Sequence, residues 1–232
     1  MVERSEQKAI YPHESFCVET SKGRLQVDLY PNNKALPLEL RKEYGEELIP
    51  LVAQGFMWPD INDPGFREDS LNHVVEVPRL LIARDDMGCA RAFIASEVKS
   101  YKDLIVYHLY GIMVDPLFHG SGLAQKISER ELEVTGSDIL LFRTQSNKML
   151  GLGRKLANLN EPLGMRLAPL AYPDNLNWLI NERIYRDGKC LYGDMDRFEK
   201  DAIPWIDWRH GDALVVAGFV NASGNYKGNK LR

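Results

Sequence analysis

The sequence predicts an α/β fold of the α+β type, and two observations carry that prediction. Apolar segments rich in β-branched and aromatic residues, which are typical of strands, are separated by segments with helical spacing. With 232 residues, of which 44% are hydrophobic, the chain can bury one large core. Between about residues 20 and 158 the expected order of elements is β, α, α, β, β, β, loop, α, β, α.

The first third of the chain contains one clear strand signal. Arg24–Tyr30 alternates leucine and valine with polar residues, which predicts a half-buried strand. Leu36–Tyr44 and Leu48–Phe56 are expected to be short helices separated near Gly45. Trp58–Asn72 is rich in proline, glycine and aspartate and is expected to be a solvated loop, which can also line an acceptor pocket.

The middle of the chain predicts a hairpin followed by a strand–loop–helix unit. Asp85-Asp86-Met87-Gly88 is a turn signal between two apolar segments. The expected elements are the strands Pro78–Arg84, Cys89–Val98 and Val106–Val114, the helix Ser121–Leu132, the strand Asp138–Gln145 and a helix from Asn147 to Asn158.

We expect residues 1–20 to be a flexible lead, residues 21–220 to be one domain with an extended region at about 160–212, and residues 221–232 to be a flexible tail. Within the extended region we expect a strand at Met165–Ala171 and a helix at Asn175–Arg186, and Ala213–Val220 is the expected last strand. An insertion over the acceptor site, a homodimer contact and plain aromatic packing all remain explanations for the long connection Leu191–Gly211.

Composition excludes several classes of protein. The net charge of −4 leaves no global basic footprint for nucleic acid and suits a cationic small-molecule or protein amine better. The three cysteines are far apart without a C-x-x-C, and the histidines lack ligand spacing, so we expect neither a disulfide framework nor a metal. No signal core or membrane-length apolar run is present, which predicts a cytoplasmic protein without a membrane contact.

The segment His119-Gly120-Ser121-Gly122-Leu123-Ala124 lies between the expected strand and helix, where a loop can cradle an anion with backbone amides. A P-loop is excluded because no Lys-Ser or Lys-Thr follows the glycines. A dinucleotide fingerprint starting at Gly120 would need its third glycine where Gln125 stands. Tight packing without any ligand is the remaining alternative for an isolated G-x-G.

The segment also fits the pattern (Gln/Arg)-x-x-Gly-x-(Gly/Ala) at every position except the first, and Val114-Asp115-Pro116 precedes it. It therefore resembles motif A of the GNAT-type N-acetyltransferases, over roughly residues 20 to 158. The resemblance implies a mixed, mostly antiparallel central sheet flanked by helices. It also implies acetyl-CoA as the cosubstrate and a bulge in the central strand, which Gly111 would mark.

The resemblance implies most of the site residues as well. Backbone groups of Ile112, Met113 and Val114 would bind the pantetheine arm and the thioester. The residues expected to hold the pyrophosphate are His119, Gly120, Ser121, Gly122, Leu123 and Ala124. His119 replaces the usual Gln or Arg, which leaves the backbone donors intact.

His108 lies six residues before Val114, on the strand where members of this family that modify histones carry a glutamate base. A neutral imidazole can accept a proton at physiological pH, but a histidine packed in a sheet fits the position equally well. Tyr110 shares its face by alternation and would orient substrate, relay a proton or pack.

Many family members carry N-x-x-A-x-x-x-Y in the next helix, with the Tyr protonating the leaving thiolate. Counted from Asn147, this chain has Leu150 in place of the alanine and Arg154 in place of the tyrosine. Arg154 would pair with a phosphate of the cofactor or face solvent.

The leading hypothesis is an N-acetyltransferase that works by direct attack of an amine in a ternary complex. The alternatives are a non-catalytic acyl-CoA-binding or interaction protein and an acyltransferase for longer acyl-CoA, which would need an apolar tunnel beside Met113.

Overall fold

The computed structural model describes residues 14–144, 146–160, 163–164, 167, 179–180 and 213–221. Its helices are α1 (Leu38–Phe56), α2 (Pro64–Val75), α3 (Leu123–Thr135) and α4 (Asn147–Leu156), with short 3₁₀ turns at η2 (Asn33–Ala35) and η3 (Pro116–Phe118). The strands are β1 (Glu14–Thr20), β2 (Gly23–Tyr30), β3 (Arg79–Arg84), β4 (Ala90–Tyr101), β5 (Leu104–Val114), β6 (Ile139–Thr144), β7 (Ala157–Leu159), β8 (Leu179–Ile180) and β9 (Ala213–Val220).

The described strands pair in the order β1-β2-β3-β4-β5-β6-β9-β7, with β8 on β9. β5 and β6 are parallel, from Val106 opposite Ile139 to Leu109 opposite Phe142. The pairs β1/β2, β2/β3, β3/β4, β6/β9, β7/β9 and β8/β9 are antiparallel. The predicted mixed, mostly antiparallel sheet is therefore confirmed.

The chain divides into two compact units, and the division passes through β4, β5 and α3. Among the described residues, the first unit contains 14–97 and Tyr110–Lys126. The second contains Val98–Leu109 and the described residues after Lys126. The expectation of a single domain over residues 21–220 stays a prediction.

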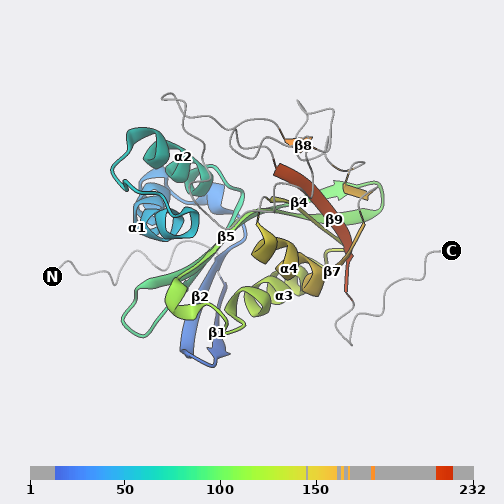
Figure 1. Cartoon of the computed structure of the whole chain (residues 1–232), viewed down its shortest axis with the longest axis horizontal. Helices are drawn as coiled ribbons and strands as arrows, with labels where there is room; N and C mark the ends of the chain where they lie inside the picture. The colour runs from blue at the N-terminus through green and yellow to red at the C-terminus, as the bar shows by residue number, and fades with distance from the viewer. Residues whose placement is uncertain are drawn as a thin grey trace. The chain divides into compact units, whose positions relative to one another are not determined.

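The first unit is built on α1, α2 and the strands β1 to β3. Its core contains Leu48, Ile49, Phe66, Leu80 and Ile82 among other buried side chains. The two short helices predicted around Gly45 are wrong, because α1 runs unbroken through this glycine. A Cβ at Gly45 would lie 2.8 Å from Cδ2 of Leu71, so the glycine allows α2 to pack closely against α1 (Figure 1).

The loop predicted over Trp58–Asn72 is also wrong in its second half, because α2 begins at Pro64. The Asp63 side chain accepts a hydrogen bond from the amide of Phe66, and Pro64 occupies the first helical position, where it needs no donor. Phe66 is buried and stacks on Trp58 with the ring centroids 5.3 Å apart. The residues that suggested a loop are therefore the start signal of a helix.

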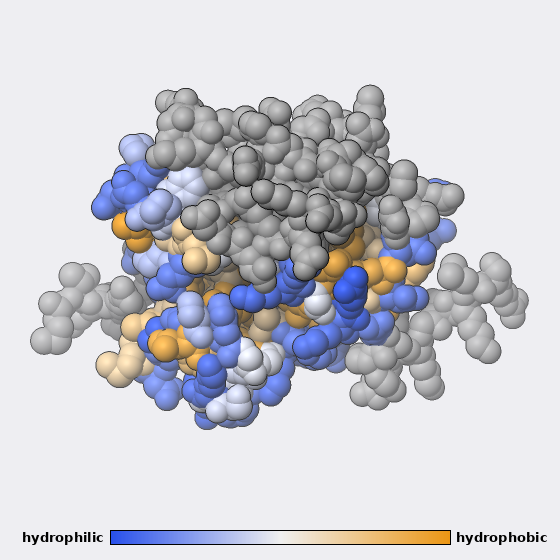
Figure 2. Space-filling model, in the orientation of Figure 1, coloured by the Kyte–Doolittle hydropathy of each residue, from blue (hydrophilic) through white to orange (hydrophobic). Residues whose placement is uncertain are grey.

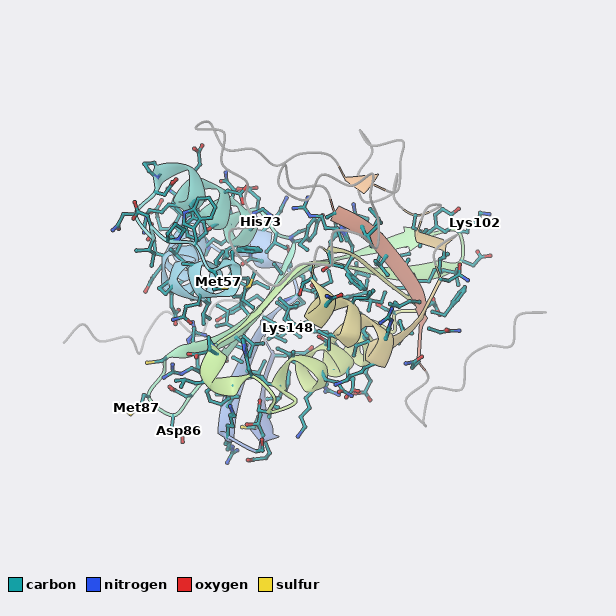
Figure 3. All side chains as sticks on the ribbon, viewed as in Figure 1. Met57, His73, Asp86, Met87, Lys102 and Lys148 are labelled. Atoms are coloured by element: carbon teal, nitrogen blue, oxygen red, sulfur yellow. The ribbon has the colours of Figure 1, made fainter. Side chains whose placement is uncertain are left out.

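The predicted hairpin between β3 and β4 is confirmed. The Asp85 amide donates to the carbonyl of Cys89, and the Asp85 side chain accepts from the amides of Met87 and Cys89. Asp86 and Met87 lie at its exposed tip (Figure 3). This turn fixes the position of the strand residues that follow it.

The second unit has its core around β6 and β9, where Ile139, Leu141, Val215 and Ala217 are buried. The helix predicted to Asn158 ends at Leu156, and β7 follows it directly. A Cβ at Gly153 would lie 2.5 Å from Cζ of Phe142, so the glycine lets α4 approach β6.

Near the two ends of the chain, the structure confirms one predicted element and differs from others. Residues 14–20 belong to the predicted flexible lead, but they form β1, which is paired along its length with β2. The last strand is confirmed as β9. Leu179 and Ile180 form β8, so the helix predicted over Asn175–Arg186 is wrong there. Leu167 is helical, so the strand predicted over Met165–Ala171 is wrong there, and the other residues of that segment lie outside the described ranges. The connection Leu191–Gly211 and the tail after Asn221 also lie outside them.

Hydrophilic and apolar side chains are interspersed on the described part of the face shown in Figure 2. Exposed large apolar residues occur singly on several elements, as on most protein surfaces. Within the ranges that the structure describes, no helix is both long and apolar enough to cross a membrane.

Candidate functional site

The strand–loop–helix unit predicted around the two glycines is confirmed. β5 ends at Val114, and Asp115 caps η3 by accepting a hydrogen bond from the amide of Leu117 at 2.8 Å. The chain then passes through His119–Gly122 and enters α3 at Leu123. All of these residues belong to the first unit.

Gly120 and Gly122 have the geometry of a backbone cradle. Their φ angles are +75° and +81°, a conformation that other L-residues rarely adopt. A Cβ at either position would meet no atom of the described residues within 4 Å, so among these residues the two glycines do not serve close packing. In the part of the chain that the structure describes, no backbone carbonyl accepts from the amides of Gly120, Gly122 and Ala124. These donors and the start of α3 together form a site suited to an anion.

The two polar side chains of the loop bind backbone carbonyls of the segment just before it. The buried Ser121 hydroxyl donates to the carbonyl of Phe118 at 2.7 Å and accepts from the amide of Leu123 at 3.3 Å. His119 Nε2 donates to the carbonyl of Val114 at 2.9 Å. His119 occupies the first position of the motif, where Gln or Arg is usual, and its side chain links the loop to the end of β5.

The end of β5 lies beside α1. Ile112, Met113 and Val114 are half-buried, and Met113 packs so closely on α1 that a Cβ at Gly55 would lie within contact distance of its sulfur. Tyr110 and Met113 both pack against the core of the first unit, although strict alternation would place residues three apart on opposite faces. The bulge predicted at Gly111 would account for this pattern and stays a prediction.

His108 is fully buried in the second unit. Burial, together with the smaller effect of the positive charges of Lys99 and Arg143, lowers the pKa of His108 to about 3. The imidazole is therefore neutral at physiological pH, as predicted, but it binds a proton weakly. Of the two alternatives that the sequence left open, the geometry favours a core histidine over a general base.

A carboxylate that the sequence analysis missed lies beside Tyr110. The Tyr110 hydroxyl donates to Oε2 of Glu97 at 2.5 Å, and both side chains are partly buried in the first unit. Glu97 follows the apolar run at the end of the predicted strand Cys89–Val98, and this position is the one signal that singles it out.

A second tyrosine–glutamate pair lies in the other unit. Tyr107 donates to Glu131 at 3.1 Å, and both residues are buried. Tyr107 and Tyr110 lie three residues apart on β5, and each donates a hydrogen bond to a glutamate. Of these two pairs, only the Tyr110 pair is partly exposed.

The predicted residues of α4 lie in the second unit and are exposed. Ser146 caps this helix by accepting from the amide of Met149. Asn147 and Arg154 are exposed, and Lys148 marks the same first turn in Figure 3. The sequence-predicted site residues thus fall into two groups. The first unit holds Tyr110, Ile112, Met113, Val114, His119, Gly120, Ser121, Gly122, Leu123 and Ala124, and the second holds His108, Asn147 and Arg154.

Over the described ranges, no group of three or more His, Cys, Asp or Glu side chains is placed to hold a metal ion. The donors at the loop are backbone amides, which suit an anion rather than a cation.

No family model and no curated protein matches this sequence. Among solved structures, a ribosomal-protein-S5-alanine acetyltransferase from Vibrio fischeri is 8% identical with a TM-score of 0.50, over 90% of this chain and 98% of that one. A phosphinothricin N-acetyltransferase is 14% identical with a TM-score of 0.45, over 85% and 99%. The NatC complex bound to Gag peptide and CoA contains a chain that is 12% identical with a TM-score of 0.42, over 84% and 99%. The chain has the fold of the GNAT-type acetyltransferases.

Proposed function

We propose that this protein is an acyl-CoA-dependent N-acetyltransferase that transfers an acetyl group to an amine by direct attack in a ternary complex. The observation that carries the proposal is the open glycine loop, whose amides at Gly120, Gly122 and Ala124 have no backbone acceptor within the described residues. A pyrophosphate offers several acceptor oxygens and negative charge to such a cradle. The fold of known acetyltransferases supports the same assignment.

Acetyl-CoA, when bound, supplies the thioester that the amine attacks. The loop His119–Ala124 would hold its pyrophosphate, and the backbone of Ile112, Met113 and Val114 would bind the pantetheine arm. Because the side chains of Ser121 and His119 bind the carbonyls of Phe118 and Val114, backbone amides would provide most of the binding. The Met113 side chain, packed on α1, would limit the room for longer acyl groups.

An ammonium ion cannot attack a thioester, so the site needs a group that accepts a proton. The Tyr110–Glu97 pair is better suited than His108, because it is partly exposed and already joined by a hydrogen bond. A proton passed to the Tyr110 oxygen would release the phenol's own proton to Glu97, so the pair would carry one proton away from the amine. His108 would then act through packing, with its neutral ring in the core.

The direct test is calorimetric titration with acetyl-CoA, CoA and a longer acyl-CoA. We expect wild-type protein to bind acetyl-CoA and Gly122→Glu to lose at least about 100-fold in affinity, because its carboxylate would meet the pyrophosphate. Gly136→Glu is the matched control, since Gly136 has φ +60° at the opposite end of α3 and equally open space. Equal binding by wild type and Gly122→Glu would contradict the cradle assignment.

One observation favours a second candidate, a non-catalytic acyl-CoA-binding protein. The position that carries the thiolate-protonating tyrosine in many family members is the exposed Arg154. Release of free CoA in the presence of a panel of small amines and basic peptides separates the two functions. Binding without release of CoA from any amine would favour the binding protein.

A further inference from the structure

Arg91 binds the carboxylates of both Asp85 and Asp115 in the first unit. It lies on β4, and its guanidinium contacts Oδ2 of Asp85 through Nε and Nη2 at 2.7 Å each. Through Nη1 it contacts Oδ2 of Asp115 at 2.7 Å. One arginine therefore links the β3–β4 turn to the residue that starts the segment leading into the glycine loop.

Asp115 in turn orients the segment that leads into the glycine loop. Its Oδ1 accepts from the amide of Leu117, and its own amide donates to the carbonyl of Arg91 at 2.7 Å. The Asp115 carbonyl also accepts from the amide of Phe118 at 2.8 Å, so four hydrogen bonds hold Asp115, and two of them are to Arg91. The 3₁₀ turn that it caps ends one residue before His119, so the orientation of Asp115 sets where the chain enters Gly120.

Asp85 is a rigid anchor for the other end. Its Oδ1 accepts from the amides of Met87 and Cys89 at 3.0 and 2.9 Å. Partial burial acts to raise the pKa of Asp85, but the hydrogen bonds from Arg91 and the two amides outweigh it and lower the pKa. The carboxylate therefore stays charged, and a tight turn holds it in place.

We infer that Arg91 is a positioning residue for the binding of acyl-CoA. It holds Asp115, and through Asp115 it keeps the amides of the glycine loop in the geometry that binds the cofactor. The inference rests on the proposed function. Arg91 would touch neither the pyrophosphate nor the thioester; it acts through Asp115. A cradle of backbone amides binds well only when its donors are already oriented, because ordering them on binding costs affinity.

The chain offers a matched control in Arg84. This arginine also bridges two carboxylates, Glu47 at 2.6 Å and Asp28 at 3.6 Å, and its side chain is buried to a similar degree. Its partners lie on α1 and β2 and are not part of the segment Asp115–Gly122 that enters the loop. Removing Arg84 therefore tests what the loss of a bridging arginine does to the fold in general.

The experiment compares wild type, Arg91→Ala, Arg91→Lys and Arg84→Ala. Acetyl-CoA affinity is measured by calorimetry, and hydrogen exchange at the amides of Leu117 and Ser121 is measured without ligand. We expect Arg91→Ala to weaken binding about tenfold and to speed exchange at both amides. Arg91→Lys should lie between, since an ammonium cannot span both carboxylates in the same way. Arg84→Ala should bind as wild type does.

Each outcome decides the inference. Unchanged affinity in Arg91→Ala, or equal loss in Arg91→Ala and Arg84→Ala, would overturn it. If Arg91→Ala does not fold, wild-type affinity in Arg91→Lys would overturn it, and a selective loss would support it. If wild type itself binds no acetyl-CoA, the proposed function fails, and the exchange data still show whether Arg91 holds the loop.

Discussion

The loop His119–Ala124 and helix α4 each carry two glycines separated by one residue, and the two pairs serve different purposes. In the loop, Gly120 and Gly122 have positive φ angles and open space around them. In α4, Gly153 has ordinary helical geometry but no room, because a Cβ would press on Phe142. A G-x-G pattern therefore has two physical meanings, and the backbone angle together with the space beyond Cα separates them. Four predictions test this contrast.

The largest effect on stability should come from filling the crowded glycine. Gly153→Leu should lower the free energy of unfolding by about 2–3 kcal/mol, because the side chain must displace the Phe142 ring. Gly151→Leu, two residues away and with no described atom within 4 Å of a Cβ, should be neutral or stabilising by about 0.5–1 kcal/mol. Urea unfolding of both variants measures the difference. Equal destabilisation would mean that α4 rejects a large side chain at both positions, whatever the space beside each glycine.

The two tyrosine–glutamate pairs differ in burial in the same way, and we expect only the partly exposed Tyr110 pair to take part in the reaction. Tyr110→Phe should lower kcat about 100-fold, roughly 2.7 kcal/mol, with little change in acetyl-CoA affinity. Tyr107→Phe should leave kcat per folded molecule unchanged and should lower stability by about 1–3 kcal/mol, because buried Glu131 loses a donor. Steady-state kinetics and thermal unfolding distinguish the variants. A kcat for Tyr110→Phe equal to that of wild type would remove the pair from the mechanism.

The buried and exposed histidines predict different pH dependence. The folded pKa of His108 is about 3, below its unfolded value, so between these values the unfolded chain binds the extra proton. Stability should therefore fall as the pH is lowered, by about 2 kcal/mol from pH 7 to pH 5 on account of this group. His108→Gln should reduce that slope, and the exposed loop variant His119→Gln should keep it. A slope unchanged in His108→Gln would mean that the ring is hydrated in solution.

The smallest effect should come from adding one methyl group to each kind of glycine. Gly122→Ala should cost about 1 kcal/mol of stability through its left-handed backbone, although nothing crowds the new Cβ. Gly151→Ala should instead stabilise the protein by about 0.5–1 kcal/mol, because alanine favours the helix. The opposite signs, measured by thermal unfolding, would sharpen the distinction between backbone angle and space. A stabilised Gly122→Ala would show that the loop does not need its positive φ.

Local signals predicted much of this molecule. The hairpin at Asp85–Gly88, the central strand ending at Val114 and the glycine loop were found from patterns of a few neighbouring residues. The errors occurred where one residue type has two uses. Gly45 suggested a break but allows close helix packing, and Asp63-Pro64 suggested a loop but starts α2. In each case a partner distant in the sequence, or a hydrogen bond to the backbone, decided between the uses.

The site shows the same division. The sequence by itself determined the strands β3 to β6, the helix α3 and the loop that can cradle an anion, because these depend on the spacing of apolar residues and on glycine within a single segment. It did not identify Glu97 beside Tyr110, the bridge of Arg91 between Asp85 and Asp115, or the burial of His108. Only the tertiary structure decided these, because hydrogen bonds between strands and the exclusion of water depend on which segments come together.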